Sequence, residues 1–254
     1  MGIFKMDGKR AFFNLKFLFL ILATAILWYF NTRRFEREED VLTVFYGGVG
    51  RSTITYITLV VCNAVYGLSV CEDLQNNAAR YILNRSSPLQ YVISKVTVCM
   101  ISSIAAYFWG TLCYLAYEVT RHPLVVPGSI IVENLKELTT FSDMLPEHTW
   151  GFILLQVLAN GICCGCMAML SLGLSIYLRD GFLVLCLPCV FFFLLLLVSE
   201  NLIKASENTE SMFWVIATSR SQIVFWSVIF LYTLGFYFMS CILLYRGIKR
   251  YEYE

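Results

Sequence analysis

Long apolar runs alternate with short polar segments along this chain, and their length predicts helices that cross a membrane. A helix needs roughly 20 predominantly apolar residues to span the hydrocarbon core of a bilayer. Six runs meet this requirement, at about residues 12–31, 53–71, 92–118, 149–177, 181–199 and 222–245. The segments between them are too short to hold a soluble catalytic domain of ordinary size. The pattern therefore predicts an all-α polytopic membrane protein with one six-span domain over residues 1–254.

The polar segment between the second and third runs carries a helical repeat of its own. Leu74, Ala78, Tyr81 and Ile82 share one face of a helix over residues 72–86, and Asp73, Gln75, Asn76, Asn77 and Arg80 share the other. Ser86, Ser87 and Pro88 then interrupt the repeat. Ser87 with Gln90 forms a capping-box pattern, and Pro88 suits the first helical position. A new helix is therefore expected to begin at Pro88 and to continue into the third span.

Three further segments lie outside the predicted spans. Residues 1–16 are basic and partly apolar, and we expect them to lie in the cytoplasmic membrane interface. The loop over residues 31–52 is expected to be a flexible outer loop. Residues 120–148, which contain both histidines, and residues 200–222 are expected on the same outer side.

Composition supports a membrane protein and gives it an orientation. The chain is 58% hydrophobic and 15% charged, with a mean hydropathy of +0.68, which excludes an ordinary soluble domain. Lys and Arg prefer the cytoplasmic side of membrane proteins. An N-terminus inside places 11 of the 19 basic residues there, namely Lys5, Lys9, Arg10, Lys16, Arg80, Arg85, Lys95, Arg179, Arg246, Lys249 and Arg250. Both termini are therefore expected in the cytoplasm of a cell whose plasma membrane holds the protein.

The segment from Glu72 to Lys95 resembles the coupling segment of the type-2 ABC transporter permeases. The similar features are an acidic start, a small polar helix, a Ser-Pro break, Tyr91 and a lysine before the third span. The short charged turn at Arg179 and the basic end YRGIKRYEYE also resemble that family. The resemblance implies the membrane subunit of an ATP-driven exporter, in which two six-span subunits pair and each presents a coupling helix to a separate ATPase subunit.

The resemblance also implies roles for particular residues. Contacts with the ATPase are expected from Glu72, Asp73, Gln75, Asn76, Arg80 and Arg85. Spans two and five would line the substrate path, with Asn63, Tyr66, Phe191 and Phe192 as candidates. Such an apolar and aromatic lining suits an amphipathic peptide or a lipophilic compound. ATP and magnesium would bind the partner ATPase and not this chain, and the second permease subunit is an identical or a related chain.

No motif points to chemistry carried out by the chain itself. The glycine-rich stretch before Ser52 departs from the phosphate-binding pattern at Phe45 and Arg51. Cys163, Cys164 and Cys166 crowd one helical stretch without a distant partner pair, so small-residue packing explains them better than a metal. No metal, cofactor or nucleic acid is expected to bind.

Two other classes of function stay open at this point. A membrane-embedded enzyme would need paired acids, histidines or metal ligands at membrane depth, and the predicted spans contain no His, Asp or Glu clear of their ends. A secondary transporter or channel would be expected to show a buried ionisable relay or an inverted repeat, and the sequence shows no evident case of either.

Overall fold

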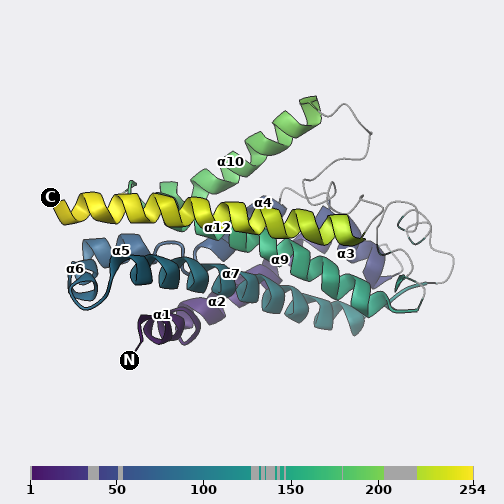
Figure 1. Ribbon diagram of the computed structural model, residues 1–254. Coiled ribbons are helices and arrows are strands. Elements are labelled where there is room, and N and C mark those ends of the chain that lie inside the picture. Colours follow the sequence, from purple (N-terminus) through teal and green to yellow (C-terminus); the bar gives the residue numbers. More distant parts are fainter. Residues whose placement is uncertain are drawn as a thin grey trace.

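A computed structural model of the chain describes residues 2–33, 40–50, 54–126, 132, 135, 141, 144, 145, 147–178, 180–202 and 222–253. Within these ranges the regular structure is helical throughout, without a strand (Figure 1). The helices are α1 (Ile3–Phe12), α2 (Leu15–Thr32), α3 (Val41–Gly50), α4 (Ile54–Asn63), α5 (Ser69–Gln75), α6 (Ala78–Leu83), α7 (Pro88–Val119), α9 (Thr149–Leu174), α10 (Gly181–Leu202) and α12 (Gln222–Tyr253).

Four helices in the described part are long and apolar enough to cross a membrane. They are α2, α7, α9 and the portion of α12 from Phe225 to Arg250. The prediction of an all-helical membrane protein is confirmed at this level, whereas six crossings and a coupling helix stay predictions. The predicted charged turn at Arg179 lies outside the described residues. So do most of the predicted outer segment 200–222 and much of the predicted outer loop 120–148.

The second predicted span is not one continuous helix. α4 ends at Asn63 after ten residues, which is about 15 Å of helix against a core of about 30 Å. Turns follow, in which the N–H groups of Val65 and Ser69 donate to carbonyls three residues back. Gly67 makes this turn possible, because a Cβ there would lie 2.5 Å from the carbonyl oxygen of Asn63. The apolar run 53–71 predicted one continuous helix, but close backbone packing at Gly67 interrupts it.

Part of the predicted loop over residues 31–52 is also helical. Asp40 begins α3, since its carboxylate accepts from the N–H of Thr43 at 2.7 Å. Val41, Leu42 and Phe45 are buried in the main core. An acidic cap followed by apolar residues at helical spacing favours a buried helix, so the expected outer loop is wrong for α3.

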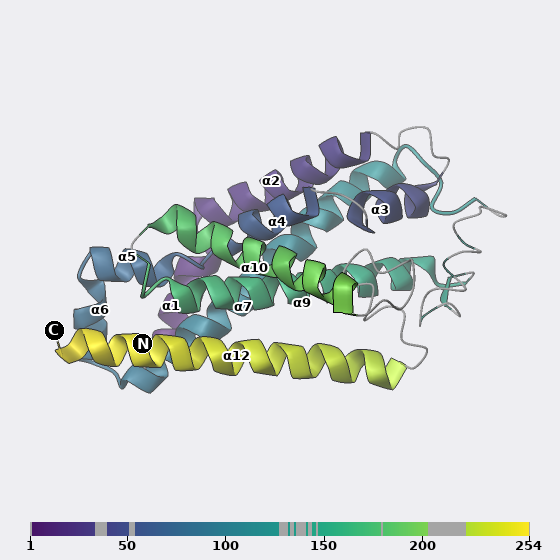
Figure 2. The same ribbon diagram turned by 90° about the horizontal axis from the view of Figure 1, so that it is seen from above.

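The core lies around α7 and α9, which cross at close range (Figure 2). Gly161 and Gly165 of α9 face α7, and a Cβ at Gly165 would come within 2.9 Å of the Ile104 side chain. The predicted packing role of this GxxxG pair is confirmed. On another side of α7, a Cβ at Gly110 would lie 2.6 Å from the Cβ of Thr24 in α2. Small residues thus let α2 and α9 pack tightly on α7.

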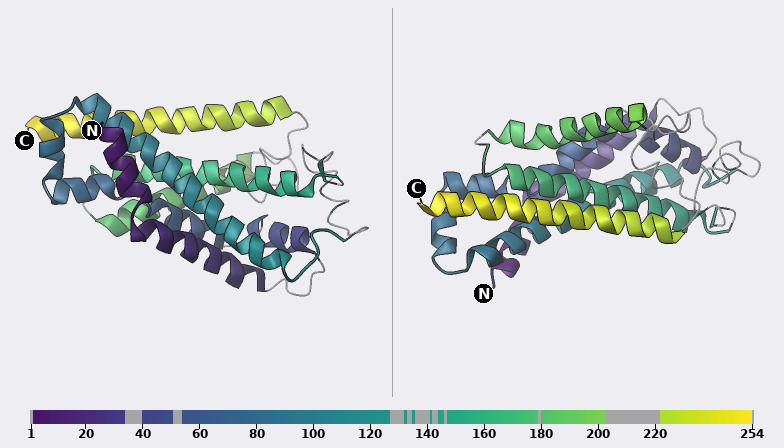
Figure 3. Two further views of the ribbon diagram at one scale, coloured as in Figure 1. Left: turned by 90° about the horizontal axis from the view of Figure 1, so that it is seen from below. Right: turned by 45° about the horizontal axis from the view of Figure 1, so that its top comes forward.

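Both chain termini lie at one end of the bundle, together with α5 and α6 (Figures 1 and 3). α1 packs against α7 at this end, with Asp7 and Ala11 buried, so the N-terminal segment is held against the bundle along one face of α1. Asn14 then caps α2 by accepting from the N–H of Lys16. The two short helices and the start of α7 therefore share this end with the basic N-terminal segment.

The segment over residues 72–86 forms two helices rather than one. Asn77 separates α5 from α6 with a φ of 54°, a left-handed conformation that asparagine tolerates better than most residues. The predicted faces change accordingly, since Tyr81 is 72% exposed while Asp73 is buried. The predicted start of the next helix is confirmed, with Ser87 accepting from the N–H of Gln90 and Pro88 in the first turn.

Candidate functional site at the α5 end of the bundle

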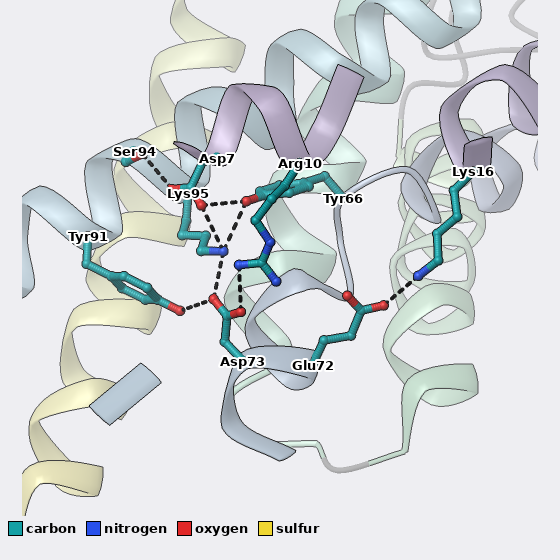
Figure 4. A network of polar contacts seen from close by, with 9 residues as sticks. All are labelled: Asp7, Arg10, Lys16, Tyr66, Glu72, Asp73, Tyr91, Ser94 and Lys95. Atoms are coloured by element: carbon teal, nitrogen blue, oxygen red, sulfur yellow. Dashed lines mark hydrogen bonds and ion pairs between the residues drawn. The ribbon is translucent and has the colours of Figure 1, made fainter. Parts of the chain in front are cut away.

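A buried cluster of charges joins α1, α5 and α7 at the end where the termini lie. Lys95 of α7 lies between Asp7 of α1 and Asp73 of α5, and all three side chains are inaccessible to solvent (Figure 4). The Nζ of Lys95 is 3.1 Å from Asp7 and 2.7 Å from Asp73. We call Asp7, Arg10, Asp73 and Lys95 the charge cluster.

The hydrogen-bonding capacity of Lys95 is fully used. An ammonium group has three donors, and Lys95 contacts Asp7, Asp73 and the hydroxyl oxygen of Tyr66, the last at 3.0 Å. Tyr66 in turn donates to Asp7 at 2.7 Å, so its hydroxyl links two members of the cluster. A buried charge is tolerated only when it is paired and hydrogen-bonded, and Lys95 satisfies both conditions.

The two carboxylates are satisfied as completely. Besides Lys95, Asp7 accepts from the hydroxyls of Tyr66 and Ser94, and Asp73 accepts from the hydroxyl of Tyr91 at 3.0 Å. Arg10 donates to the remaining oxygen of Asp73 at 2.9 Å. Two cations and two anions therefore balance, and five donor side chains with two acceptor carboxylates fix three helices to one another.

Electrostatics keep Asp73 ionised despite its burial. Burial alone raises the pKa of a carboxyl group, but the charges and hydrogen bonds of Lys95 and then Arg10 outweigh it and hold the pKa of Asp73 below its ordinary value. For Arg10, burial opposes the charge, while Asp73 raises the pKa of the guanidinium. Both members of this ion pair therefore stay charged at neutral pH.

A second, more exposed ion pair repeats the link between the N-terminal segment and α5. Lys16 donates to Glu72 at 2.8 Å, with side chains 61% and 43% exposed (Figure 4). An exposed pair of this kind contributes about 1 kcal/mol or less. The buried cluster is thus the main fastening of α5, and Lys16 with Glu72 supplements it.

The residues predicted to contact an ATPase differ in their exposure. Asp73 is 1% exposed and its carboxylate binds Arg10, Tyr91 and Lys95 within the chain, so this predicted contact residue is not presented to a partner. Glu72 is half-exposed. The exposed members of the set are Gln75, Asn76, Arg80 and Arg85, joined by Asn77 and Tyr81. We call these six residues the α5–α6 surface.

The residues predicted to line a path do not share one environment. Asn63 is fully buried, and in the described structure neither its amide nitrogen nor its amide oxygen has a hydrogen-bond partner. Tyr66 binds two members of the charge cluster, Asp7 and Lys95, through its hydroxyl group. Phe192 is buried with its ring 6.1 Å from that of Tyr56, whereas the neighbouring Phe191 is 39% exposed. Asn63 and Phe192 therefore lie inside the protein, and Phe191 lies on its outer surface.

Sequence reasoning missed the central role of Lys95 and the participation of Asp7. A usable indication was present, because Lys95 lies within the apolar run 92–118, and an ionisable residue in such a run is usually paired. Its partners were not evident, since Asp7 is 88 residues away along the chain. No group of three or more His, Cys, Asp or Glu side chains suited to a metal occurs among the described residues, and Cys163, Cys164 and Cys166 are free thiols.

Comparisons with protein families, with curated proteins and with solved structures find no match to this chain.

Proposed function

We propose that this chain is the membrane subunit of an ATP-driven exporter, with the α5–α6 surface as the docking site for a separate ATPase. The proposal goes back to the resemblance of residues 72–95 to the type-2 ABC permeases. The observation that carries it is the fastening of α5. This helix connects through Asp73 to α1 and α7 at once, while its neighbouring residues present an exposed polar surface.

A helix fastened in this way suits the transmission of movement. A displacement of α5 would have to carry Lys95 with it or separate a buried ion pair, and breaking a buried pair costs about 3–5 kcal/mol. Moving as a unit with α7 is the less costly response. Since α7 packs against α2 and α9, a partner that pulls on α5 would bias the arrangement of the whole bundle.

The composition of the α5–α6 surface also suits a protein partner. Tyr81 is 72% exposed at the end of the bundle, next to Arg80 and with Arg85 following α6. Tyrosine and arginine are the residue types that most often dominate binding energy at protein interfaces. ATP and magnesium would act on the partner chain, and the permease itself would catalyse no reaction.

In this proposal two permease chains and two ATPase chains form the working unit in the plasma membrane. Exposed apolar side chains on α2, α10 and α12 provide surface for lipid and for a second permease. The substrate is proposed to be an amphipathic peptide or a lipophilic compound, on account of the aromatic pair Tyr56 and Phe192 between α4 and α10 and the buried Asn63. Whether the second permease is identical is decided by the mass of the purified complex.

The docking proposal is tested by charge reversal on the α5–α6 surface. The double variant Arg80→Glu with Arg85→Glu leaves the charge cluster intact, and an unfavourable charge contact at an interface costs several kcal/mol. We expect more than tenfold less ATPase to co-purify with the variant, together with loss of ATP-dependent transport in vesicles. Arg121→Glu, at the opposite end of α7, is the matched control and should leave both properties unchanged.

One result with the double variant would overturn the docking proposal. If the double variant keeps a Walker-motif ATPase at the wild-type ratio and transports at the wild-type rate, α5–α6 is only a connection between spans. Glu72→Lys with Asp73→Lys is not a suitable probe, because a lysine at position 73 would face Lys95 and Arg10 in a buried site.

One observation favours a second candidate, an ion-coupled transporter. The charge cluster contains buried ionisable groups of both signs, Asp7, Asp73 and Lys95. Proton-coupled transporters carry such groups. The same vesicles distinguish the two functions, since transport driven by a pH gradient without ATP supports the second candidate and excludes the first.

A further inference from the structure

A cavity of about 430 Å³ lies beside the charge cluster, where the junction of α1 and α2 faces α4 and α5. Its polar wall includes Arg10, Lys16 and Glu72, and its apolar wall includes Phe19, Leu20 and Val65. The cavity opens to the surroundings. One groove is therefore lined by both charged and apolar groups.

The charged and the apolar lining residues lie at different positions along α2. Arg10 and Lys16 lie at or before the start of this helix, at the end of the bundle, while Phe19 and Leu20 lie one turn further into the span. The outer side of α2 continues as an exposed apolar stripe made of Leu15, Leu18, Phe19, Leu22, Ile26 and Phe30. A side chain stripe of this kind at helical spacing faces lipid in a membrane protein. The groove thus leads from a cationic end directly onto a lipid-facing surface.

The two cations at the polar end are held in place yet keep donors to spare. In the described structure Arg10 uses one nitrogen for Asp73, and Lys16 makes one contact, with Glu72. A guanidinium has five N–H donors and an ammonium has three. Both side chains are part-exposed, at 40% and 61%. A phosphate oxygen can therefore bind them without displacing either acid.

We infer that this groove binds an acidic phospholipid, with its phosphate on Arg10 and Lys16 and an acyl chain along Phe19 and Leu20. The site is distinct from the α5–α6 surface and does not rest on the proposed function. A soluble phosphate would use only the cationic end of the groove. A phospholipid would place its phosphate at the cations and an acyl chain along the apolar residues, so a lipid fits the whole site better.

The site is positioned to sense the state of the bundle. The same Arg10 that would bind phosphate also holds Asp73 of α5, and Lys16 holds Glu72 beside it. A lipid bound here would therefore contact the N-terminal segment and α5 together. Its binding free energy adds to the stability of that junction by mass action.

The experiment measures lipid binding to the purified full-length chain in a neutral detergent, by native mass spectrometry and by thermal unfolding. Phosphatidylglycerol is the probe, with phosphatidylcholine as the uncharged comparison and glycerol 3-phosphate as the soluble source of the same phosphate chemistry. We expect one phosphatidylglycerol per chain to bind in preference to phosphatidylcholine and to raise the unfolding temperature. Glycerol 3-phosphate at equal concentration should neither bind nor compete.

Two variants change the lining of the groove at different places. Lys16→Gln removes one cation from an exposed position and should weaken phosphatidylglycerol binding about fivefold. Ala64→Trp fills the groove from the opposite side and should abolish stoichiometric binding while leaving both cations in place. Lys9→Gln is the matched control, because Lys9 carries the same charge on the exposed face of α1 but does not line the groove.

Three results would each overturn the inference. Equal binding of phosphatidylcholine would show that charge plays no part. Equal losses from Lys9→Gln and Lys16→Gln, with none from Ala64→Trp, would show general attraction of the basic segment to any acidic surface. Displacement by glycerol 3-phosphate would show a site for a soluble anion.

Discussion

At the scale of single residues, Lys95 determines whether two buried aspartates are tolerated at the end of the bundle. Removing an isolated ion from water costs several kcal/mol even after the protein relaxes, and the cost is offset only by close partners and complete hydrogen bonding. Asp7 and Asp73 both meet that requirement through the same ammonium group. Loss of this one cation therefore affects two anions together.

Replacing Lys95 with methionine should destabilise the protein more than any exposed substitution nearby. Methionine keeps most of the side-chain volume but leaves Asp7 facing no cation and Asp73 with Arg10 alone. We expect the free energy of unfolding to fall by about 3–5 kcal/mol, measured by denaturant unfolding in detergent. Lys9→Met on the exposed side of α1 is the control and should change it by less than about 0.5 kcal/mol.

Restoring charge balance should recover much of that loss. The triple variant with Asp7→Asn, Asp73→Asn and Lys95→Met removes the buried anions along with the cation. A similar loss in the triple and in the single variant would mean that the packing of Lys95, and not its charge, holds α1 and α5 to α7.

The lowered pKa of Asp73 predicts how its contribution depends on pH. A carboxyl group whose pKa is lower in the folded state stabilises that state above its unfolded pKa of about 3.9, and the contribution disappears as the pH falls through the folded value. The difference in unfolding free energy between wild type and Asp73→Asn should therefore be constant from pH 7 to pH 5. Below about pH 4 the difference should shrink. A difference that grows on acidification would contradict the assigned direction.

At the scale of elements, the sequence predicted those features that depend on residues close together along the chain. The start of α7 was predictable because Ser87, Pro88 and Gln90 act within one turn, and the close α7–α9 contact was predictable from the spacing of Gly161 and Gly165. α3 was predictable in principle from Asp40 and the apolar residues after it. These features depend on neighbours that are at most a few residues apart.

Features that depend on distant partners were not predictable in this way. The helical repeat placed Asp73 on a polar face, and nothing local showed that Lys95, 22 residues later, and Arg10, 63 residues earlier, would enclose it. The break at Asn77 was not predicted either. A left-handed residue turns the following side chains onto a different face, so Tyr81 is exposed and not on the apolar side. The predicted ATPase-contact residues therefore lie together at one end of the bundle, but Asp73 is buried instead of exposed.

Two glycines offer a matched test of helix packing. Gly110 faces Thr24 at a distance that leaves no room for a Cβ, whereas nothing lies within 4 Å of a Cβ built at Gly235 of α12. Gly110→Ala should push α2 away from α7 and cost about 1–3 kcal/mol. Gly235→Ala should be neutral or stabilise the protein by up to about 1 kcal/mol, because alanine favours the helix. Unfolding of both variants in one detergent gives the comparison, and equal stability would rule out a close α2–α7 contact.

At the scale of the whole molecule, the bundle has two different ends. One end gathers both termini, the charge cluster and the α5–α6 surface, and the other holds the C-terminal end of α7 (Figures 1 and 3). The core around α7 and α9 is well packed between them, while α2, α10 and α12 expose long apolar side chains outward. In a membrane, all segments at one end of the bundle lie on the same side, so the topology reduces to which end faces the cytoplasm.

The last prediction concerns that orientation. The basic residues of the N-terminal segment, of α6 and of the end of α12 lie at the same end of the bundle, and Lys and Arg are retained on the cytoplasmic side during insertion. In a chain whose ten cysteines are replaced, a cysteine at Gln75 should react with an impermeant maleimide only after the cells are permeabilised. A cysteine at Arg121 should react in intact cells. Both positions are exposed, so unequal labelling reports the side of the membrane and not burial. Labelling at Gln75 from outside would place the α5–α6 surface beyond the reach of a cytoplasmic ATPase and exclude the proposed exporter.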